Sequence, residues 1–364
     1  MRAALLETHS APLNVVDDIH VEDPREGEVQ VQVSHCGICH SDLTVVDMPA
    51  GEMLPQVLGH EAAGTVVEVG PGVTRLQKGD KVMLTPLPTC GVCYFCGRGQ
   101  PQLCVEGQNF MTGLRMDGSS PLSRDGERVF HGFGLGGWGE LTTVHERRAV
   151  KIAEDTPLEI ACVIGCSVQT GVGAVLNTAK VEEGATVLVT GLGGIGVSIV
   201  QGARLANASK IIVSDPVAER RDYAANFGAT HVLDPGQDDV VAKAQEITNG
   251  IGVDYAFDGA GHEKLIEDCL NATRVGGTMT MVGAAMGAFT IPMPALFLTQ
   301  EKKIQGCLLG SCNSHRDVPN FLALWRKGAL DLESMVTHRH KISDVNVGLD
   351  HMRESRGLRH VLEF

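Results

Sequence analysis

Residues 185–215 read ATVLVTGLGGIGVSIVQGARLANASKIIVSD, and this stretch decides the fold of the central part of the chain. Its start, ATVLVT, is an apolar run rich in β-branched residues, which predicts a buried strand. The next segment, GGIGVSIVQGARLA, predicts a helix, and KIIVSD predicts a second strand. A strand, a helix and a second strand form one right-handed unit of a parallel sheet.

The glycine run GLGGIG at 191–196 follows the first strand and opens the helix, which is the setting that a dinucleotide-binding loop requires. Gly191 allows the tight turn, Gly193 admits the pyrophosphate, and Gly196 lets helix and strand pack closely. The free N–H groups at the helix N-terminus favour an anion. The predicted cofactor-binding residues of the loop are Gly191, Gly193, Gly194, Ile195 and Gly196.

The residue that ends the second strand, Asp215, indicates which dinucleotide binds. It lies 19 residues after Gly196, near the offset expected for an acid that holds the adenosine ribose hydroxyls. A carboxylate there repels a 2′-phosphate, so NAD is favoured over NADP. Arg220 lies nearby and is able to tolerate a phosphate, although a charge on a solvated helix face is its ordinary role.

Strand and helix patterns continue on both sides of this unit. Towards the C-terminus the predicted strands are HVLD, VDYAFDG and GTMTMVG, with helical stretches near 238–249 and 263–271. Residues 1–150 instead predict short strands bounded by Gly, Pro and Asp, at 29–36, 62–70 and 80–86. Residues 313–364 carry helix signals and end in the β-like HVLEF. The chain therefore predicts a β-rich part followed by a doubly wound α/β part.

Length and composition agree with a globular protein of two domains. The chain has 364 residues, a net charge of −14, 44 glycines and 11 cysteines. The acidic balance argues against a nucleic-acid partner. Three runs lack charge, at 160–179, 184–203 and 275–300, and such runs are typical of a buried parallel sheet rather than of membrane spans. Since the start, MRAALLETHSAP, does not resemble a signal peptide, we expect a cytoplasmic protein that binds no membrane.

Four cysteines lie within fifteen residues, in the pattern C-x2-C-x2-C-x7-C at Cys90, Cys93, Cys96 and Cys104. Four thiolates on a short loop fit a tetrahedral structural zinc site. An iron–sulfur cluster also takes four cysteines and is the alternative. Because such a site has no open position, we expect it to hold a loop in place.

A second set of metal-binding residue types lies in HCGICHSD, followed by GHE at 59–61 and by IGCSVQTG. A catalytic zinc takes three protein ligands and leaves one position open, and two cysteines with one histidine are a known set. Alone, CxxCH also indicates haem attachment or a redox dithiol formed by Cys36 and Cys39. His60 alone fits a core histidine, and Cys166 alone fits a buried thiol. The residues by themselves do not show that these side chains converge.

Together these motifs resemble the zinc-dependent medium-chain alcohol dehydrogenases over the whole length of the chain. The segments that carry the resemblance are CGICHSD, GHE, the cysteines at 90–104, GCSVQTGVGAV, GLGGIG with IIVSD, and the terminal GLRHVLEF. The resemblance implies an α/β protein with a Rossmann coenzyme domain and a β-rich, GroES-like catalytic domain. It implies a catalytic domain at 1–168 and 307–364, a structural-zinc lobe near 88–106, and an NAD-binding domain at 169–306.

The resemblance also implies roles for individual residues. Cys39, His60 and Cys166 match the ligands of the catalytic zinc, Cys36 matches a structural neighbour, and the lobe cysteines match the structural zinc site, which gives two zinc ions per chain. Asp42 and Glu61 match groups that orient the zinc ligands. The residues that match coenzyme contacts outside the glycine loop are His40, Thr170, Arg220, Val282, Ala284 and Arg359.

The implied reaction is the reversible oxidation of primary or aromatic alcohols to aldehydes or ketones, with hydride transfer to NAD. Ser41 matches the hydroxyl that takes the substrate proton. Many relatives pass this proton to a histidine three residues later, but this chain has Thr44 there, so we expect a different relay. Ala50, Pro86 and Asn109 stand where relatives often carry bulky apolar groups, which leaves the substrate class open.

Three further hypotheses remain from the sequence. A thiol-adduct (formaldehyde-type) dehydrogenase of the same family has the same zinc and NAD parts. A nucleotide-binding redox sensor that uses Cys36 and Cys39 belongs to a different class and predicts a reversible disulfide without turnover. The long segment at 105–137 resembles in length that of the dimeric animal and plant members of the family, which implies a homodimer rather than a tetramer.

Overall fold

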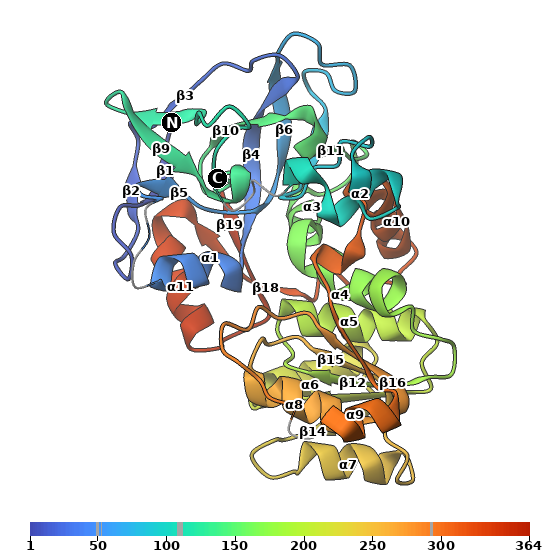
Figure 1. Ribbon diagram of the computed structural model, residues 1–364. Helices are drawn as coiled ribbons and strands as arrows, with labels where there is room; N and C mark the ends of the chain where they lie inside the picture. The colour runs from blue at the N-terminus through green and yellow to red at the C-terminus, as the bar shows by residue number, and fades with distance from the viewer. Residues whose placement is uncertain (49–50, 52, 108–111, 292–293) are drawn as a thin grey trace. The chain divides into compact units, whose positions relative to one another are not determined.

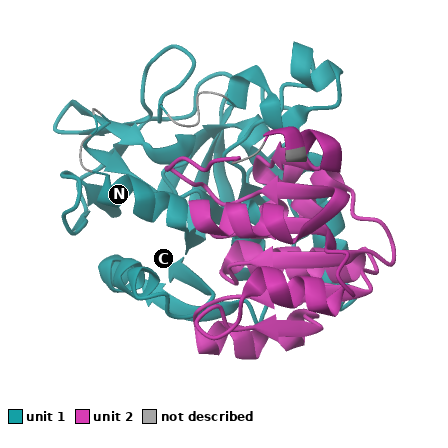
Figure 2. Ribbon diagram, turned by 60° about the horizontal axis from the view of Figure 1, so that its bottom comes forward, with its two compact units in different colours: residues 1–166, 313–328, 332–364 teal, residues 167–312, 329–331 magenta. Residues whose placement is uncertain are grey.

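The computed structural model describes residues 1–48, 51, 53–107, 112–291 and 294–364. These residues form two compact units (Figure 2). Unit 1 comprises 1–166, 313–328 and 332–364, and unit 2 comprises 167–312 and 329–331. The assignment of catalysis to one unit and coenzyme binding to the other stays a prediction.

Unit 1 is β-rich and contains two sheets (Figure 1). The first has the strand order β2-β1-β5-β9-β8-β3, with bounds Asn14–Val16, Ala3–Leu6, Gln56–Val57, Glu127–His131, Leu122–Arg124 and His20–Val21. The second has the order β11-β7-β6-β4-β19-β18, with bounds Ala149–Lys151, Lys81–Leu84, Glu61–Val69, Glu28–Ile38, Arg359–Glu363 and Val336–Lys341. Strand β10 (Leu141–His145) also pairs with β4.

The helices of unit 1 are α1 (His40–Asp47), α2 (Tyr94–Gly97), α3 (Leu158–Val163), α10 (Ser314–Arg326) and α11 (Val345–Arg353). The end of β4 lies between the start of β6 and the start of β19. In the register of these strands, Gly37 is opposite Glu61 and Ile38 is opposite His360. The chain leaves β4 at this point and enters α1, so three strand ends and a helix N-terminus meet at one place.

Unit 2 is a parallel six-stranded sheet with the order β14-β13-β12-β15-β16-β17. The strands span His231–Leu233, Lys210–Ser214, Thr186–Thr190, Val253–Asp258, Thr273–Met281 and Lys303–Gly306. Its helices are α4 (Gln169–Gly173), α5 (Gly194–Leu205), α6 (Ala218–Phe227), α7 (Val240–Ile247), α8 (Glu263–Ala272) and α9 (Pro294–Gln300). When the six strands are numbered 1 to 6 in chain order, they lie side by side in the sheet in the order 3-2-1-4-5-6, which is the Rossmann arrangement. The predicted fold class is confirmed.

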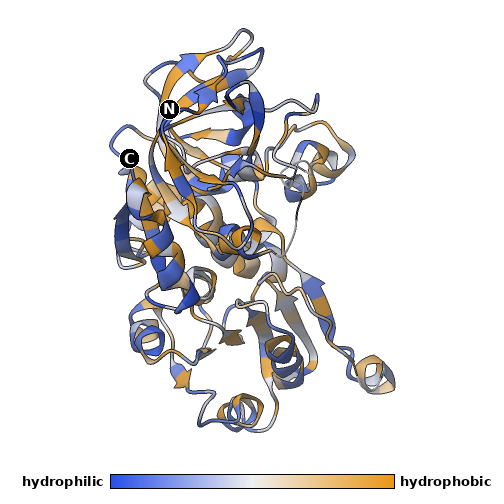
Figure 3. Ribbon diagram, turned by 90° about the vertical axis from the view of Figure 1, so that its left-hand side faces the viewer, coloured by the Kyte–Doolittle hydropathy of each residue, from blue (hydrophilic) through white to orange (hydrophobic). Residues whose placement is uncertain are grey.

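Each unit has its own buried apolar core. In unit 1 the core includes Leu5, Val31, Val57 and Trp138, which come from strands of both sheets and the adjoining loop. In unit 2 it is formed by residues of the sheet and of α7 and α8. Hydrophobic and hydrophilic stretches alternate along several helices (Figure 3), as expected for helices with one face packed on a sheet.

One of the uncharged runs does not form a strand. Residues 160–179 belong to a helical stretch, Leu158–Ala179, in which α3, a π-helical segment (Ile164–Val168), α4 and a second π-helical segment (Ala174–Ala179) follow one another. Among the described residues it is the one helix whose length and composition suit a membrane span, and 83% of its most apolar window is buried. A helix that is covered over most of its surface needs little polar face, which explains the missing charge.

Candidate active site

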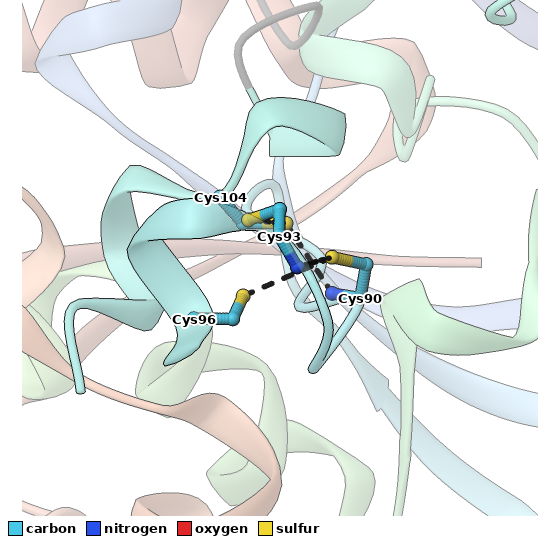
Figure 4. Close-up of side chains that lie close together, drawn as sticks. All are labelled: Cys90, Cys93, Cys96 and Cys104. Carbon is cyan, nitrogen blue, oxygen red and sulfur yellow. Dashed lines mark hydrogen bonds between the residues drawn. The ribbon is translucent and has the colours of Figure 1, made fainter. Parts of the chain in front are cut away.

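The cysteines of the lobe come together around α2. Cys96 lies in this helix, Cys90 and Cys93 precede it, and Cys104 follows the short 3₁₀ turn Pro101–Leu103. The four Sγ atoms all lie within 4.8 Å of one another. Figure 4 shows the backbone N–H of Cys93 donating to Sγ of Cys90, and the N–H of Cys90 donating to Sγ of Cys104, each over 3.3 Å. The loop therefore points N–H donors at the sulfur atoms, which stabilises thiolates.

The thiols of the lobe differ in pKa. A backbone hydrogen bond from Cys96 is the largest influence that lowers the pKa of Cys93, to about 6. Burial raises the pKa of Cys96 to about 12. The donor set, four sulfur atoms from one loop with no open position, fits a structural zinc ion.

A second cluster joins parts of unit 1 that are distant in sequence. Cys39 is the N-cap of α1, His60 directly precedes β6, and Cys166 lies in the π-helical segment Ile164–Val168. Single π-helical turns inside helices are frequent at functional sites. Sγ of Cys39, a ring nitrogen of His60, Sγ of Cys166 and a carboxylate oxygen of Glu61 all lie within 4.8 Å of one another. The sequence-predicted residues Cys39, His60 and Cys166 are thus brought together.

Asp42, which is fully buried in α1, holds this cluster in place. Its carboxylate accepts hydrogen bonds from the backbone N–H groups of Cys39 and Gly59, over 3.3 and 3.0 Å, and from Nδ1 of His60 over 3.1 Å. Since Asp42 as a carboxylate only accepts, Nδ1 of His60 donates to it, and Nε2 is the nitrogen that can bind a metal ion once it has lost its own proton.

The pKa values in this cluster are shifted strongly. The hydrogen bond with Cys166 is the largest influence that holds the pKa of Cys39 well below its ordinary value, and the same bond raises the pKa of Cys166. Burial lowers the pKa of His60, but the charges of Asp42 and Cys39 outweigh it and raise the pKa overall. A thiolate beside a thiol and an oriented imidazole form a donor set that a zinc ion fits, because the ion replaces the shared proton.

Glu61 and Arg359 form a buried ion pair beside this cluster. Burial raises the pKa of Glu61 to about 7, although Arg359 opposes the rise. Oε1 of Glu61 and Nε of Arg359 have no hydrogen-bond partner among the described residues. Gly37, opposite Glu61, makes room for the carboxylate, because a Cβ there would lie 2.1 Å from Oε2. The resemblance implied Arg359 as a coenzyme contact, and its ion pair with Glu61 was not foreseen from the sequence.

In unit 2 the glycine loop joins β12 to α5. Gly191 has a φ of +82°, which favours glycine. A Cβ on Gly196 would lie 1.7 Å from the carbonyl oxygen of Gly191, so helix and strand are packed too closely for a side chain. The N-cap Gly193 has open space at its Cβ position, with nothing within 4 Å. The loop therefore leaves room beside the N-terminus of α5, where Gly194 and Ile195 form the first turn.

Asp215 is buried directly after β13 and contacts this loop. Its carboxylate accepts from the N–H of Leu192 over 2.6 Å and from that of Val217 over 2.8 Å. Arg220 is half-buried in α6, where burial lowers its pKa and Asp215 opposes the shift. At the same edge of the sheet, Asp258 ends β15 and accepts from the N–H groups of Ala260 and Gly261. The strand pattern VDYAFDG was the signal for Asp258, which sequence reasoning did not use.

Comparisons with known proteins agree with this geometry. Residues 25–154 match the alcohol dehydrogenase GroES-like domain, and residues 194–327 match the zinc-binding dehydrogenase domain. The chain belongs to the zinc-dependent medium-chain alcohol dehydrogenases. It is 37% identical to an S-(hydroxymethyl)glutathione dehydrogenase of Paracoccus denitrificans, over 99% of each chain. It is 35% identical to an NDMA-dependent alcohol dehydrogenase of Amycolatopsis methanolica, over 99% of this chain and 98% of the relative.

Solved structures of this dehydrogenase family have the same fold. A zinc-binding alcohol dehydrogenase protein from Burkholderia ambifaria superposes with a TM-score of 0.93 at 32% identity, covering 100% of this chain and 98% of that one. Benzyl alcohol dehydrogenase from Acinetobacter calcoaceticus gives a TM-score of 0.93 at 30% identity, covering 100% and 99%.

The remaining predicted residues of this dehydrogenase lie in both units. In unit 1, Ser41 lies with Oγ 3.9 Å from Sγ of Cys39, and His40 is exposed in α1. The exposed Thr44 donates from Oγ1 to the carbonyl oxygen of His40 over 2.8 Å. Pro86 is buried, whereas Ala50 and Asn109 lie outside the described residues.

In unit 2, Thr170 is buried in α4. Val282 directly follows β16 and is buried, and Ala284, two residues later, is exposed. Both lie at the sheet edge that also carries the glycine loop. Their roles beside the nicotinamide stay predictions.

Proposed function

We propose that this chain is a zinc- and NAD-dependent alcohol dehydrogenase that oxidises primary or aromatic alcohols to the matching carbonyl compounds. The observation that carries the proposal is the cluster of Cys39, His60 and Cys166, of which the first two are buried and the third half-buried. Its donor set fits a three-ligand catalytic zinc with one open position. The lobe cysteines hold a second zinc ion, so the two cysteine-containing clusters together bind two zinc ions per chain.

When bound, the zinc ion supplies Lewis acidity towards the alcohol oxygen, and NAD supplies the hydride acceptor. The chain's own residues prepare the site for both. Asp42 fixes the tautomer of His60, because its carboxylate accepts the Nδ1 proton. The thiolate of Cys39 provides negative charge at a place where water is excluded. Glu61 and Arg359 add a neutral ion pair behind the cluster.

The proton of the alcohol passes to the Ser41 hydroxyl, which lies beside the sulfur of Cys39. Thr44, one turn further along α1, has its hydroxyl proton bonded to the carbonyl oxygen of His40 and carries no base. The proton therefore leaves Ser41 by a path that does not use the side chain at position 44.

NAD binds at the carboxyl edge of the unit 2 sheet. Gly193 leaves space for the pyrophosphate, and Asp215 has accepting capacity left beyond its two bonds to backbone N–H groups. A buried carboxylate at this place disfavours a 2′-phosphate, which supports NAD over NADP.

NADH formation across a panel of primary aliphatic and aromatic alcohols tests this proposal. We expect turnover with at least one alcohol class, a strong preference for NAD over NADP, and loss of turnover in Gly193→Val, which fills the open space. The matched control is Gly306→Val, at an exposed glycine that ends β17, has open space at its Cβ position and has no positive φ. Protein that holds two zinc ions and forms no NADH with any alcohol contradicts the proposal.

A second candidate substrate is a thiol adduct of formaldehyde. The relative from Paracoccus denitrificans, an S-(hydroxymethyl)glutathione dehydrogenase at 37% identity over nearly the whole chain, favours it. Formaldehyde offered with and without glutathione separates the two candidates, because only the adduct enzyme requires the thiol. An additional arm with NDMA as oxidant tests the behaviour named for the Amycolatopsis methanolica relative.

A homodimer in the cytoplasm stays part of the proposal. Analytical ultracentrifugation of the zinc-loaded chain tests the dimer, which has twice the 38.7 kDa mass of one chain.

A further inference from the structure

Four histidines gather in unit 1 apart from both cysteine clusters. His338 and His340 come from β18, His351 from the last turn of α11, and His360 from β19. The ring of His360 stacks on that of His338 with centroids 4.6 Å apart, and it lies 5.3 Å from the ring of His340. The ring of His351 lies 5.6 Å from each of the rings of His340 and His360. Figure 1 shows the three elements β18, β19 and α11.

The hydrogen bonds of this group fix which nitrogen atoms carry protons. Nε2 of His360 lies 2.9 Å from the carbonyl oxygen of Arg356, which only accepts, so Nε2 is protonated. Burial lowers the pKa of His360 to about 4, so the ring is neutral and Nδ1 holds a lone pair. Nε2 of His340 lies 3.0 Å from this Nδ1 and donates to it. Burial also lowers the pKa of His340, with His351 and His338 adding to the shift.

His351, from α11, has a ring nitrogen without a hydrogen-bond partner among the described residues. This nitrogen, Nδ1, is buried. Buried polar nitrogens without partners are rare, because desolvation without a compensating bond is costly. One ring nitrogen from each of His340, His351 and His360 lies within 4.8 Å of the other two.

We propose that His340, His351 and His360 bind one divalent transition-metal ion of the Zn²⁺ class, at a third metal site separate from both cysteine clusters. Three imidazoles are ligands that Zn²⁺, Ni²⁺ and Cu²⁺ accept, and three protein ligands leave a position for water. The bond from Nε2 of His360 to the Arg356 carbonyl is the outer contact that orients a metal-binding histidine through its other nitrogen.

Metal binding here requires only a small change. The proton on Nε2 of His340 moves to Nδ1 of the same ring, which frees Nε2 without releasing a proton. At a Zn–N distance of about 2.0–2.1 Å, tetrahedral ligand atoms lie roughly 3.4 Å apart. The 3.0 Å between the nitrogens of His340 and His360 therefore widens by a few tenths of an ångström.

The bound ion cross-links β18, α11 and β19. We therefore expect it to stabilise the C-terminal segment of unit 1 against unfolding. Strand β19 also carries Arg359, next to His360, and pairs with the end of β4. The bound ion would thus stabilise β19, the strand that carries Arg359, which forms the ion pair with Glu61.

Zn²⁺ uptake by the full-length, zinc-loaded protein tests the proposal. Equilibrium dialysis against micromolar free Zn²⁺, followed by elemental analysis, is done for the wild type, His351→Gln, His340→Gln and His20→Gln. His20 is an exposed histidine on β3 and serves as the matched control. The melting temperature of each variant before Zn²⁺ is added reports whether it is folded.

We expect the wild type and His20→Gln to take up one equivalent more than His351→Gln and His340→Gln. The added ion should raise the melting temperature of the wild type by on the order of 5 °C at a large excess over Kd, and leave that of His351→Gln unchanged. Equal uptake by the wild type and His351→Gln overturns the proposal. This readout counts added equivalents and is independent of alcohol turnover.

Discussion

The two cysteine-containing clusters of unit 1 differ in how they are built. The lobe takes all four sulfur atoms from fifteen consecutive residues, and three of the four cysteines are only half-buried. The cluster of Cys39, His60 and Cys166 takes its atoms from three distant segments, and in it Cys39 and His60 are buried while Cys166 is half-buried. A carboxylate orients its histidine, and a buried ion pair lies beside it. The first arrangement suits a structural site, because four cysteines fill the coordination of a zinc ion, whereas the second suits catalysis, because two cysteines and one histidine leave one position open.

The largest effect is expected at Cys39. In Cys39→Ser the zinc affinity of the buried cluster falls and kcat/KM for alcohol oxidation drops by about 10³-fold or more, since several kcal/mol of charge stabilisation are lost. The zinc content falls by one equivalent. Steady-state kinetics with elemental analysis measure both. Cys307→Ser, at a thiol in neither cluster, is the matched control and should behave as the wild type.

A smaller loss of zinc affinity is expected when Cys39, His60 and Cys166 all remain but the group that orients His60 is removed. In Asp42→Asn the acceptor of the His60 proton is weakened, and the affinity of this cluster for zinc falls about 10–100-fold. Competition with a chelator measures the loss. If the affinity of the lobe falls instead, the assignment of Asp42 to the buried cluster is wrong.

At the lobe the effect should appear in stability. Cys96→Ser removes one of four ligands, and we expect the melting temperature to fall by on the order of 5–10 °C. The kcat of the folded fraction should change by less than about threefold, because the lobe cysteines form a cluster separate from the proposed catalytic ligands. A loss of kcat as large as that of Cys39→Ser would remove the distinction between the two clusters.

The difference in exposure also predicts how the thiols react once zinc is stripped. Because the pKa of Cys93 is lowered to about 6, the thiolate is present above that pH and is protonated as the pH falls through it. Alkylation of half-buried Cys93 should therefore be half-maximal near pH 6. Cys39, 5% exposed, should react slowly throughout. Peptide mapping of iodoacetamide-treated apo-protein measures both, and equal rates would contradict the account.

The smallest effect concerns the proton path from Ser41. Thr44→His adds an exposed imidazole one turn along α1, and we expect kcat/KM to gain an inflection near pH 6.5, rising with pH as the imidazole becomes a base. An unaltered pH profile would show that this position takes no part in proton transfer.

The sequence predicts the fold and the lobe well because both rest on local patterns. The run GLGGIG between a strand and a helix predicts the turn that Gly191 and Gly196 form, and the spacing of the four lobe cysteines predicts their convergence. The cluster of Cys39, His60 and Cys166 could be predicted only from the resemblance to a family, because Cys39 and His60 are 21 positions apart and His60 and Cys166 are 106 positions apart. Only the pairing of β4 with β6 and the packing of α3 bring them together.

Other features had no local signal. The ion pair of Glu61 and Arg359 joins residues that are 298 positions apart. The histidine group at 338–360 depends on the parallel pairing of β18 with β19 and on the place of α11. The helical nature of 160–179 was missed because a buried helix and a buried strand both lack charge.

The central claim is that alcohol oxidation depends on zinc in the cluster of Cys39, His60 and Cys166. The most direct measurement is NADH formation while this zinc is removed by a chelator and then returned, with the lobe zinc retained. We predict that activity falls in proportion to the zinc lost from this cluster and returns when one equivalent per chain is restored. Full activity in protein that holds zinc in the lobe alone would contradict the account.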